Sequence, residues 1–150
     1  MSTARELPII FMPGDRIYFR PVEPGDTKRY QRWINDPGTW VNMLSYKPVS
    51  EEAERQALQQ FTSDPYSAAF AVVLREGDLH IGGVGLHHIH PRNRSAQFGI
   101  MIGETAYRGQ GYGTEATRLM LRYAFETLNL HRVELGVYAI NPAGIRAYEN

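Results

Sequence analysis

The residues best suited to chemistry form one short segment, Arg108-Gly109-Gln110-Gly111-Tyr112-Gly113. Glycine at alternate positions lets the backbone approach a ligand, because no Cβ stands in the way, and it permits positive φ angles. The segment joins a predicted strand to a predicted helix, so its N–H groups converge at a helix N-terminus, where unsatisfied donors and partial positive charge favour phosphate. Arg108 adds a full charge and a fork of donors. The pattern predicts a site for a ligand that carries phosphate groups.

Two common nucleotide-binding patterns fit this segment poorly. A Walker loop needs Gly-Lys-Ser or Gly-Lys-Thr, and the sequence contains neither triplet. A Rossmann fingerprint needs G-x-G-x-x-G after the first strand of a βαβ unit, whereas the three glycines here are spaced G-x-G-x-G and follow predicted antiparallel strands. A protein that binds a nucleotide such as ATP or NAD through the same loop stays as one alternative.

The elements that must position the segment follow from the spacing of apolar, β-branched and turn residues. Strands are predicted at 16–22, 67–75, 80–89, 95–102 and 132–137. Helices are predicted to begin at Pro24, at Ser50 and at Ala143, and a longer one spans 111–128. The order β-α-α-β-β-β-α-β-α, with short turns between the three central strands, predicts an α/β fold: a mixed, mostly antiparallel central sheet flanked by helices.

The second predicted helix shows how its start and its inner face are inferred. Ser50 can cap it, and Glu51 and Glu52 lie in the first turn, where the helix dipole favours negative charge. We expect its inner face to consist of four apolar residues, namely Ala53, Ala57, Leu58 and Phe61.

Composition limits the functions that fit. The chain has 150 residues, which suits one domain over 1–150, and 16 basic against 16 acidic residues, so no overall field favours nucleic acid or an anionic membrane. The absence of cysteine excludes disulfides, a cysteine nucleophile and thiolate metal sites. Three histidines cluster at His87, His88 and His90; alternation on a strand puts the last two on one face, and without cysteine or H-E-x-x-H spacing we predict no metal.

Residues 1–12 lack the apolar run of a signal peptide, and no stretch reaches the roughly 18 apolar residues that span a bilayer. We therefore expect a cytoplasmic protein without a membrane partner.

The glycine segment closely resembles the signature Q/R-x-x-G-x-G/A of the GNAT acetyltransferases, which lies between the fourth strand and the third helix of that fold. Arg108, Gly111 and Gly113 match it. A second segment, Asn141 to Tyr148, is similar to the family's N-x-x-A/S-x-x-x-Y, and the element order agrees, so the resemblance covers nearly the whole chain. Residues 17–26 and 33–37 look like the subgroup of ribosomal-protein N-terminal acetyltransferases, and spermidine acetyltransferases share much of that pattern.

The resemblance implies a cosubstrate, acetyl-CoA, and a role for each matching position. Backbone at Met101, Ile102 and Gly103 would pair with pantetheine, and the Met101 N–H would polarise the thioester carbonyl. Asn141 would contact the CoA arm, and Tyr148 would protonate the departing thiolate. The amides that would hold the pyrophosphate are those of Arg108, Gly109, Gln110, Gly111, Tyr112, Gly113 and Thr114.

The general base is where the sequence departs from the family pattern. Some members carry a glutamate early on the fourth strand, and that position is Gln97 here. A protonated amine must lose a proton before or during attack. Several ways to remove this proton stay open. The acceptor could be Glu104, one of the histidines His87, His88 and His90, or a chain of water molecules, or the enzyme could capture the neutral fraction of the amine.

These implications lead to one expected function and a different alternative. We expect acetyl transfer to a primary amine, a protein N-terminus or a small polyamine, by direct attack in a ternary complex. A non-catalytic acyl-CoA-binding module is the alternative, and Gln97 is its best support. Family members continue past the final helix, whereas this chain stops at Asn150, so we expect the last strand or strands to be missing, or a partner chain in a homodimer to complete the sheet edge.

Overall fold

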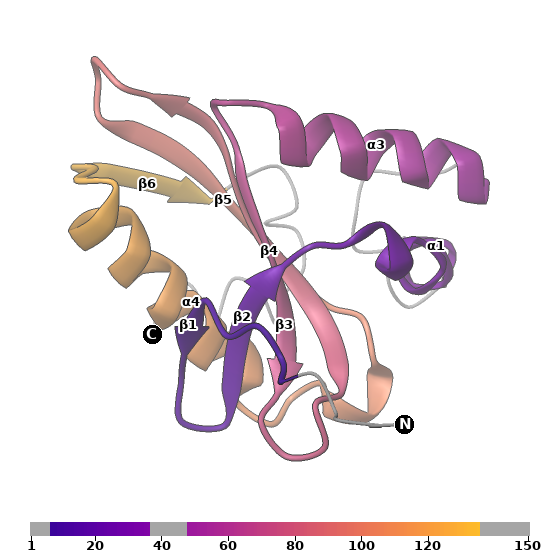
Figure 1. Ribbon diagram of the computed structural model, residues 1–150. Coiled ribbons are helices and arrows are strands. Elements are labelled where there is room, and N and C mark those ends of the chain that lie inside the picture. Colours follow the sequence, from indigo (N-terminus) through magenta and orange to yellow (C-terminus); the bar gives the residue numbers. More distant parts are fainter. Residues whose placement is uncertain (1–6, 37–47, 136–150) are drawn as a thin grey trace, which may run out of the picture.

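The computed structural model describes residues 7–36 and 48–135, which form a twisted six-stranded sheet with helices on both faces (Figure 1). The strand order is β1-β2-β3-β4-β5-β6, antiparallel throughout except for the parallel pair β5 and β6. The strands are β1 (Met12–Pro13), β2 (Ile17–Pro21), β3 (Ala68–Leu74), β4 (His80–His90), β5 (Ser95–Ile102) and β6 (Arg132–Leu135). The predicted mixed, mostly antiparallel sheet is therefore confirmed.

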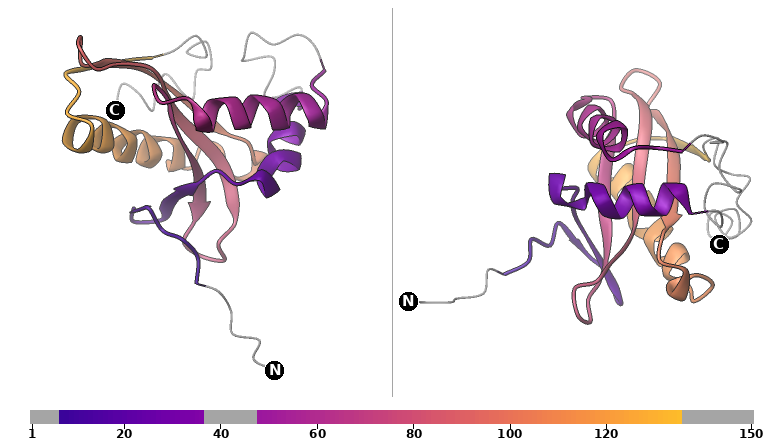
Figure 2. Two further views of the ribbon diagram at one scale, coloured as in Figure 1. Left: turned by 45° about the horizontal axis from the view of Figure 1, so that its top comes forward. Right: turned by 90° about the vertical axis from the view of Figure 1, so that its right-hand side faces the viewer.

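In the described residues, three α-helices flank the sheet. A 3-10 turn at Pro24–Asp26 leads into α1 (Thr27–Asn35), and α3 (Glu51–Ser63) lies beside α1 on the same side of the sheet (Figure 2). The third helix, α4 (Tyr112–Arg122), continues through a π-helical turn at Tyr123–Thr127 and packs on the other face. The predicted last helix and the end of the last predicted strand lie outside the described residues.

The main core lies between the sheet and α4. Alternate residues of the strands point to this side, which is why Phe19, Val72, Leu86 and Phe98 are fully or almost fully buried there. The α4 residues that cover them, Ala116, Leu119 and Met120, are spaced as one helical stripe. A core of this size fixes the start of α4, and with it the glycine segment.

On the opposite face, two glycines of β4 let α1 and α3 come close to the sheet. A Cβ at Gly83 would lie 2.8 Å from the Tyr30 hydroxyl, and a Cβ at Gly85 would lie 2.9 Å from the Phe61 ring. Such contacts are too short for any side chain. The aromatic rings of the two helices therefore rest directly on backbone.

The predicted inner face of α3 is partly wrong. The Ser50 cap is confirmed, because its Oγ accepts a hydrogen bond from Ala53 N–H at 3.0 Å. However, Ala53 and Ala57 are exposed, and the half-buried positions are Glu54, Leu58 and Phe61, spaced i, i+4 and i+7. The apolar character of the two alanines favoured them in the sequence, but the large Phe61 packs against Gly85 of the sheet, and its stripe faces inward.

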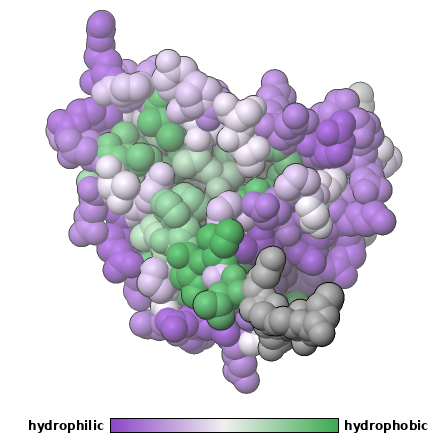
Figure 3. Space-filling view, in the orientation of Figure 1, coloured by the Kyte–Doolittle hydropathy of each residue, from purple (hydrophilic) through white to green (hydrophobic). Residues whose placement is uncertain are grey.

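A short strand, β1, pairs with β2 at the edge of the sheet. Phe11 N–H donates to Phe19 O at 2.7 Å, and the Phe11 ring stacks on Phe70 with centroids 5.0 Å apart. Apolar residues gather near the middle of the face in Figure 3, and the large exposed apolar side chains include Leu7, Ile9 and Ile10. In the described part of the chain, no helix has the length and apolar character needed to cross a membrane.

Candidate active site

The glycine segment forms a tight turn at the N-terminus of α4, as predicted. Gly109 and Gly111 have φ angles of 72° and 88°, a region that favours glycine, and Gly111 is the N-cap residue. Glu115 N–H donates to Gly111 O at 3.1 Å. It is the first N–H of α4 with an acceptor four residues back, so the N–H groups of residues 112–114 lie at the open helix end.

Arg16 supports this turn from outside, and sequence reasoning missed it. Its Nη1 donates to Gln110 O at 3.0 Å, and its guanidinium lies 4.2 Å from the centroid of the Tyr112 ring. Its Nε contacts Glu115 Oε1 at 3.2 Å, while Glu115 Oε2 accepts from the backbone N–H of Arg16 at 2.8 Å and of Ile17 at 3.3 Å. The pair is separated by 99 residues in sequence, so no local spacing could have revealed it.

Arg108 ties the turn to the end of β5. Its Nε donates to Ile102 O at 2.8 Å, across the short 3-10 turn at Thr105–Tyr107. One guanidinium N–H is thus used to fix the backbone between the strand and the helix. The turn and the strand end are held as one unit, which places the candidate phosphate-binding and pantetheine-binding residues side by side.

Within the described residues, the end of β5 is paired with a strand on one side only. β6 pairs with β5 from Ser95 to Phe98, so within the described residues the β6 side of Met101 and Ile102 has no strand partner. The other side is paired with β4, where Met101 lies opposite Gly83. Backbone groups on an open edge can pair with an extended ligand, which is what the assignment of Met101 and Ile102 requires.

Gly103 is placed differently from the two residues before it. Its N–H donates to Ile81 O at 2.8 Å, and a Cβ at this position would lie 2.1 Å from Cδ2 of the buried Trp33 indole. Gly103 therefore serves as the contact between β5 and α1. This packing is a reason for glycine that the sequence pattern did not reveal.

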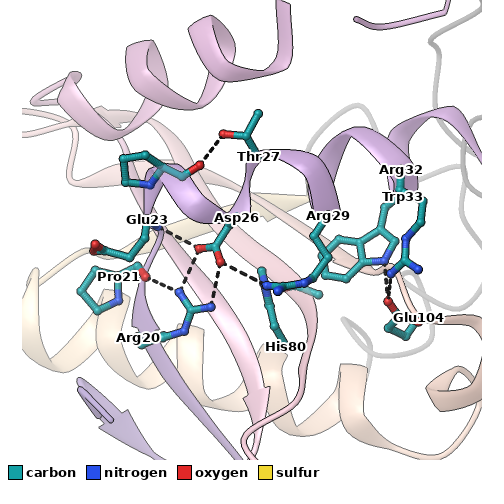
Figure 4. A network of polar contacts seen from close by, with 12 residues as sticks. Arg20, Pro21, Glu23, Asp26, Thr27, Arg29, Arg32, Trp33, His80 and Glu104 are labelled. Carbon is teal, nitrogen blue, oxygen red and sulfur yellow. Dashed lines mark hydrogen bonds and ion pairs between the residues drawn. The ribbon is translucent and has the colours of Figure 1, made fainter. Parts of the chain in front are cut away.

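Glu104 follows directly and also binds α1. Its carboxylate accepts a hydrogen bond from Trp33 Nε1 at 2.9 Å and pairs with the Arg32 guanidinium (Figure 4). The side chain is partly buried. Both donors hold the carboxylate in place, so the candidate base Glu104 acts in this structure as an anchor for the strand end.

A buried polar cluster lies under α1 (Figure 4). Asp26 accepts two hydrogen bonds from Arg20, both at 2.9 Å, and one from Glu23 N–H at 2.8 Å. Burial by itself raises the pKa of Asp26, but the bonds from Arg20 and Glu23 outweigh it and leave this pKa below its usual value. Asp26 is therefore charged and joins β2 to the start of α1.

His80, at the start of β4, completes this cluster. Its Nε2 lies 2.8 Å from Gly82 O, so Nε2 must carry the proton and donate. Nδ1 then accepts from Arg29 Nη1 at 2.9 Å. Burial lowers the pKa of His80 to about 4, against a smaller opposing effect of Asp26, so the imidazole is neutral at pH 7. The His80 ring packs edge-on against the rings of Tyr30 and Trp33, so we assign His80 a structural role.

The burial of the three clustered histidines agrees with the predicted alternation. The β4–β5 pairing is nevertheless irregular between His87 and His90, and His88 has a φ of 51°. His88 and His90 are exposed, whereas His87 is half-buried against Phe61, with ring centroids 4.7 Å apart. Burial, with a smaller effect of His88, lowers the pKa of His87. His87 pairs in register with Gln97.

Two predicted site residues, Asn141 and Tyr148, lie outside the described residues. The described chain contains no group of three or more His, Asp or Glu side chains that could hold a metal ion.

Fold and site together define the class: an α/β domain in which a glycine turn at a helix N-terminus adjoins the end of a central strand. The chain belongs to the acetyltransferase (GNAT) domain family, whose family model matches residues 16–150. It is an N-acetyltransferase with acetyl-CoA as its acetyl donor.

Relatives agree with this assignment. The spermidine N(1)-acetyltransferase of Escherichia coli is 29% identical over 88% of this chain and 69% of its own. The Drosophila melanogaster alpha/beta-tubulin-N-acetyltransferase 9 is 26% identical, over 91% of this chain and 74% of its own. The crystal structure of spermidine N-acetyltransferase from Vibrio cholerae in complex with CoA and spermine is 27% identical, with a TM-score of 0.76, over 89% of this chain and 78% of that one.

Proposed function

We propose that the chain transfers the acetyl group of acetyl-CoA to a primary amine by direct attack in a ternary complex. The observation that carries the proposal is the joint geometry of the glycine turn and the end of β5, whose β6 side is unpaired within the described residues, tied together by the bond from Arg108 to Ile102 O. The first can hold a pyrophosphate at a helix N-terminus, and the second can pair with a pantetheine arm.

In this reaction the amine nitrogen forms a bond to the thioester carbon, and the C–S bond then breaks. Negative charge develops on the carbonyl oxygen, and we assign the Met101 N–H as its hydrogen-bond donor. The amine loses one proton, and the departing thiolate gains one. Tyr148, by its position in the family motif, is proposed as that acid.

For the amine proton, we propose His87 as the acceptor, acting through water. Its side chain shares a sheet face with Met101, because both residues lie in register on this face: Met101 is opposite Gly83, and His87 is four residues beyond Gly83. That spacing corresponds to about 13 Å along a strand, which is too far for direct transfer. The lowered pKa of His87 keeps its imidazole neutral near pH 7, ready to take up a proton.

The acceptor is proposed to be a small polyamine or a protein N-terminus. Support for a polyamine comes from the names of the Escherichia coli and Vibrio cholerae relatives, and support for a protein from that of the Drosophila melanogaster relative. We also propose self-association, since one similar structure, at 28% identity and a TM-score of 0.70, is a dodecameric spermidine N-acetyltransferase. Light scattering that finds only monomer at tens of micromolar would contradict this last point.

Parallel thermal shifts with acetyl-CoA, CoA, ATP and NAD test the cosubstrate. A ligand at 100 times its Kd adds about 2.7 kcal/mol of stability, which for a domain of this size raises Tm by about 5–10 °C. We expect a shift with the two CoA species only. A shift with ATP or NAD instead would select a nucleotide-binding protein.

Thiol release then separates catalysis from binding. With acetyl-CoA saturating, spermidine and a peptide with a free N-terminus are offered in separate reactions. Turnover of either supports the proposal. Stabilisation by CoA without turnover of any amine would support the non-catalytic acyl-CoA-binding module instead.

A further inference from the structure

Strand β4 carries one extra residue where it passes under α1. His80 packs edge-on against the Tyr30 ring of α1, and a Cβ at Gly83 would touch the same ring. Residues on one face of a regular strand are an even number of positions apart, whereas these two are three apart. The pairing of β4 with β3 shifts its register at the same place. Ile81 and Gly82 therefore form a β-bulge, a feature that bends a strand and is common beside active sites.

The end of β5 pairs with this bulge. Ile81 O accepts hydrogen bonds from two successive N–H groups, that of Gly103 at 2.8 Å and that of Glu104 at 3.2 Å. Gly82, the second residue of the bulge, lies in register with Ile102. The course of the backbone at the end of β5 therefore depends on the shape that β4 takes at residues 81 and 82.

Gly82 gives room to the carbonyl group of Met101. A Cβ at residue 82 would lie 2.1 Å from Met101 O, 3.0 Å from Ile102 Cα and 3.1 Å from Met101 C. In a regular sheet the side chains stand roughly perpendicular to the strands, so a Cβ clears the backbone of the next strand. Here the Met101 oxygen occupies the place where a side chain would begin. The obstructing atoms belong to backbone, which cannot rotate aside as the end of a side chain can.

His80 holds Gly82 from the side of the buried polar cluster (Figure 4). Its Nε2 donates to Gly82 O at 2.8 Å, and its Nδ1 accepts from Arg29 Nη1 at 2.9 Å. Arg29 in turn pairs with the buried Asp26. A continuous set of polar contacts thus runs from the start of α1 to the peptide group of Gly82, against which the Met101 carbonyl lies.

We propose that Gly82 is a positioning residue for acetyl transfer, which sets the direction of the peptide groups at Met101, and that His80 holds it in place. The inference rests on the proposed function, in which the Met101 N–H polarises the thioester carbonyl. A Cβ at residue 82 would push the Met101 oxygen back by about 1 Å or more before an ordinary contact distance is reached. A misplacement of about 1 Å can cost about 100-fold in rate.

The test uses acetyl-CoA alone, labelled with carbon-13 at the acetyl carbonyl. A carbonyl that accepts a hydrogen bond has a lower stretching frequency, so infrared difference spectra report how strongly the protein polarises the thioester. We expect the unmodified protein to lower this frequency on binding, and Gly82→Ala to lose about half of the shift or more. The Kd for CoA should change less than about threefold, because the glycine turn is untouched. For any amine that is turned over, kcat should fall by about 10- to 100-fold.

Gly85→Ala is the matched control for a loss of stability. It lies on the same strand, and its new Cβ would lie 2.9 Å from the Phe61 ring, so this variant should also melt at a lower temperature. Its partner on β5 is Gly99 and not Met101. We expect Gly85→Ala to keep the carbonyl shift and the Kd for CoA of the unmodified protein.

Two substitutions of His80 test the same point with a smaller change, and they carry the test if Gly82→Ala does not fold. An asparagine amide oxygen stands near the place of Nδ1, so His80→Asn keeps an acceptor for Arg29 and loses the donor to Gly82 O. A glutamine amide nitrogen stands near the place of Nε2, so His80→Gln keeps that donor. We expect the carbonyl shift to shrink in His80→Asn and to persist in His80→Gln.

Several results would overturn the proposal. A full carbonyl shift in folded Gly82→Ala would do so, as would an equal loss in Gly85→Ala or equal shifts in the two His80 variants, because each would indicate only a general effect of stability. If the unmodified protein binds acetyl-CoA without lowering the carbonyl frequency, the proposal fails together with the role of Met101, whereas acetyl-CoA binding stands. A failure to bind acetyl-CoA at all would remove the proposed function itself.

Discussion

Replacing Gly103 by alanine tests the contact that joins the end of β5 to α1. The new Cβ would lie 2.1 Å from Trp33 Cδ2 and 2.3 Å from Cγ. Carbon atoms in contact lie about 3.5–4.0 Å apart, so the indole or the strand must move by more than about 1 Å. Trp33 is only 2% exposed, with its Nε1 bound to Glu104 and its ring against His80, so movement breaks other contacts.

The expected cost follows from this confinement. Overpacking of a close-packed site typically costs about 1–3 kcal/mol, which for a domain of about 150 residues corresponds to a fall in Tm of about 3–10 °C. The matched control is Gly25→Ala, because a Cβ there meets nothing within 4 Å and its φ is not in the positive range. We expect that control to be neutral or slightly stabilising.

Chemical denaturation and thermal melting of both variants give the free energy of unfolding. A second comparison introduces the same Gly103 change into a Trp33→Ala background, where the ring that it would strike is gone. The cost of the glycine substitution should then shrink by more than half. Equal Tm values for Gly103→Ala and the unmodified protein, or an undiminished cost in the Trp33→Ala background, would refute the packing argument.

Three further predictions concern other parts of the site. The pKa of His80 is lowered from 6.5 to about 4, so between these pH values the unfolded chain takes up a proton that the folded chain does not. The free energy of unfolding should therefore fall by about 2–3 kcal/mol as pH drops from about 6.5 to about 4. Urea melts of His80→Gln should show a shallower fall over the same pH range. Glu115→Ala leaves the N–H groups of Arg16 and Ile17 without their acceptor, so calorimetry should find weaker CoA binding and a lower Tm, and an unchanged Kd would contradict a role for this pair in shaping the turn. His87→Gln should lower kcat while leaving the Kd for CoA unchanged, and a loss that vanishes above pH 9, where more amine is neutral, would identify the missing proton acceptor.

The sequence was informative wherever the structural cause is local. The Ser50 cap, the positive φ angles of Gly109 and Gly111, and the strand–turn–helix order each depend on residues a few positions apart. Backbone permissiveness and hydrogen bonding to near neighbours are encoded in residue type, so the glycine turn at the start of α4 could be predicted. The alternation of apolar residues likewise predicted the mixed, mostly antiparallel sheet.

The sequence was misleading where two faces of an element compete. Ala53 and Ala57 were predicted on the inner face of α3. The helix instead turns Glu54 inward, because the ring of Phe61 on the same stripe packs against Gly85. The irregularity between His87 and His90 could not be inferred either, since it depends on how β4 pairs with β5.

By itself, the sequence determined the class of fold, the glycine turn and the family of the chain, since these rest on backbone geometry and on short-range spacing. Only the tertiary structure decided what supports and surrounds the turn: Arg16 and Glu115 across 99 residues, Trp33 on Gly103, and Glu54 facing the sheet. Such contacts depend on which faces of distant elements meet. Packing selects them from many arrangements that satisfy the local pattern equally well.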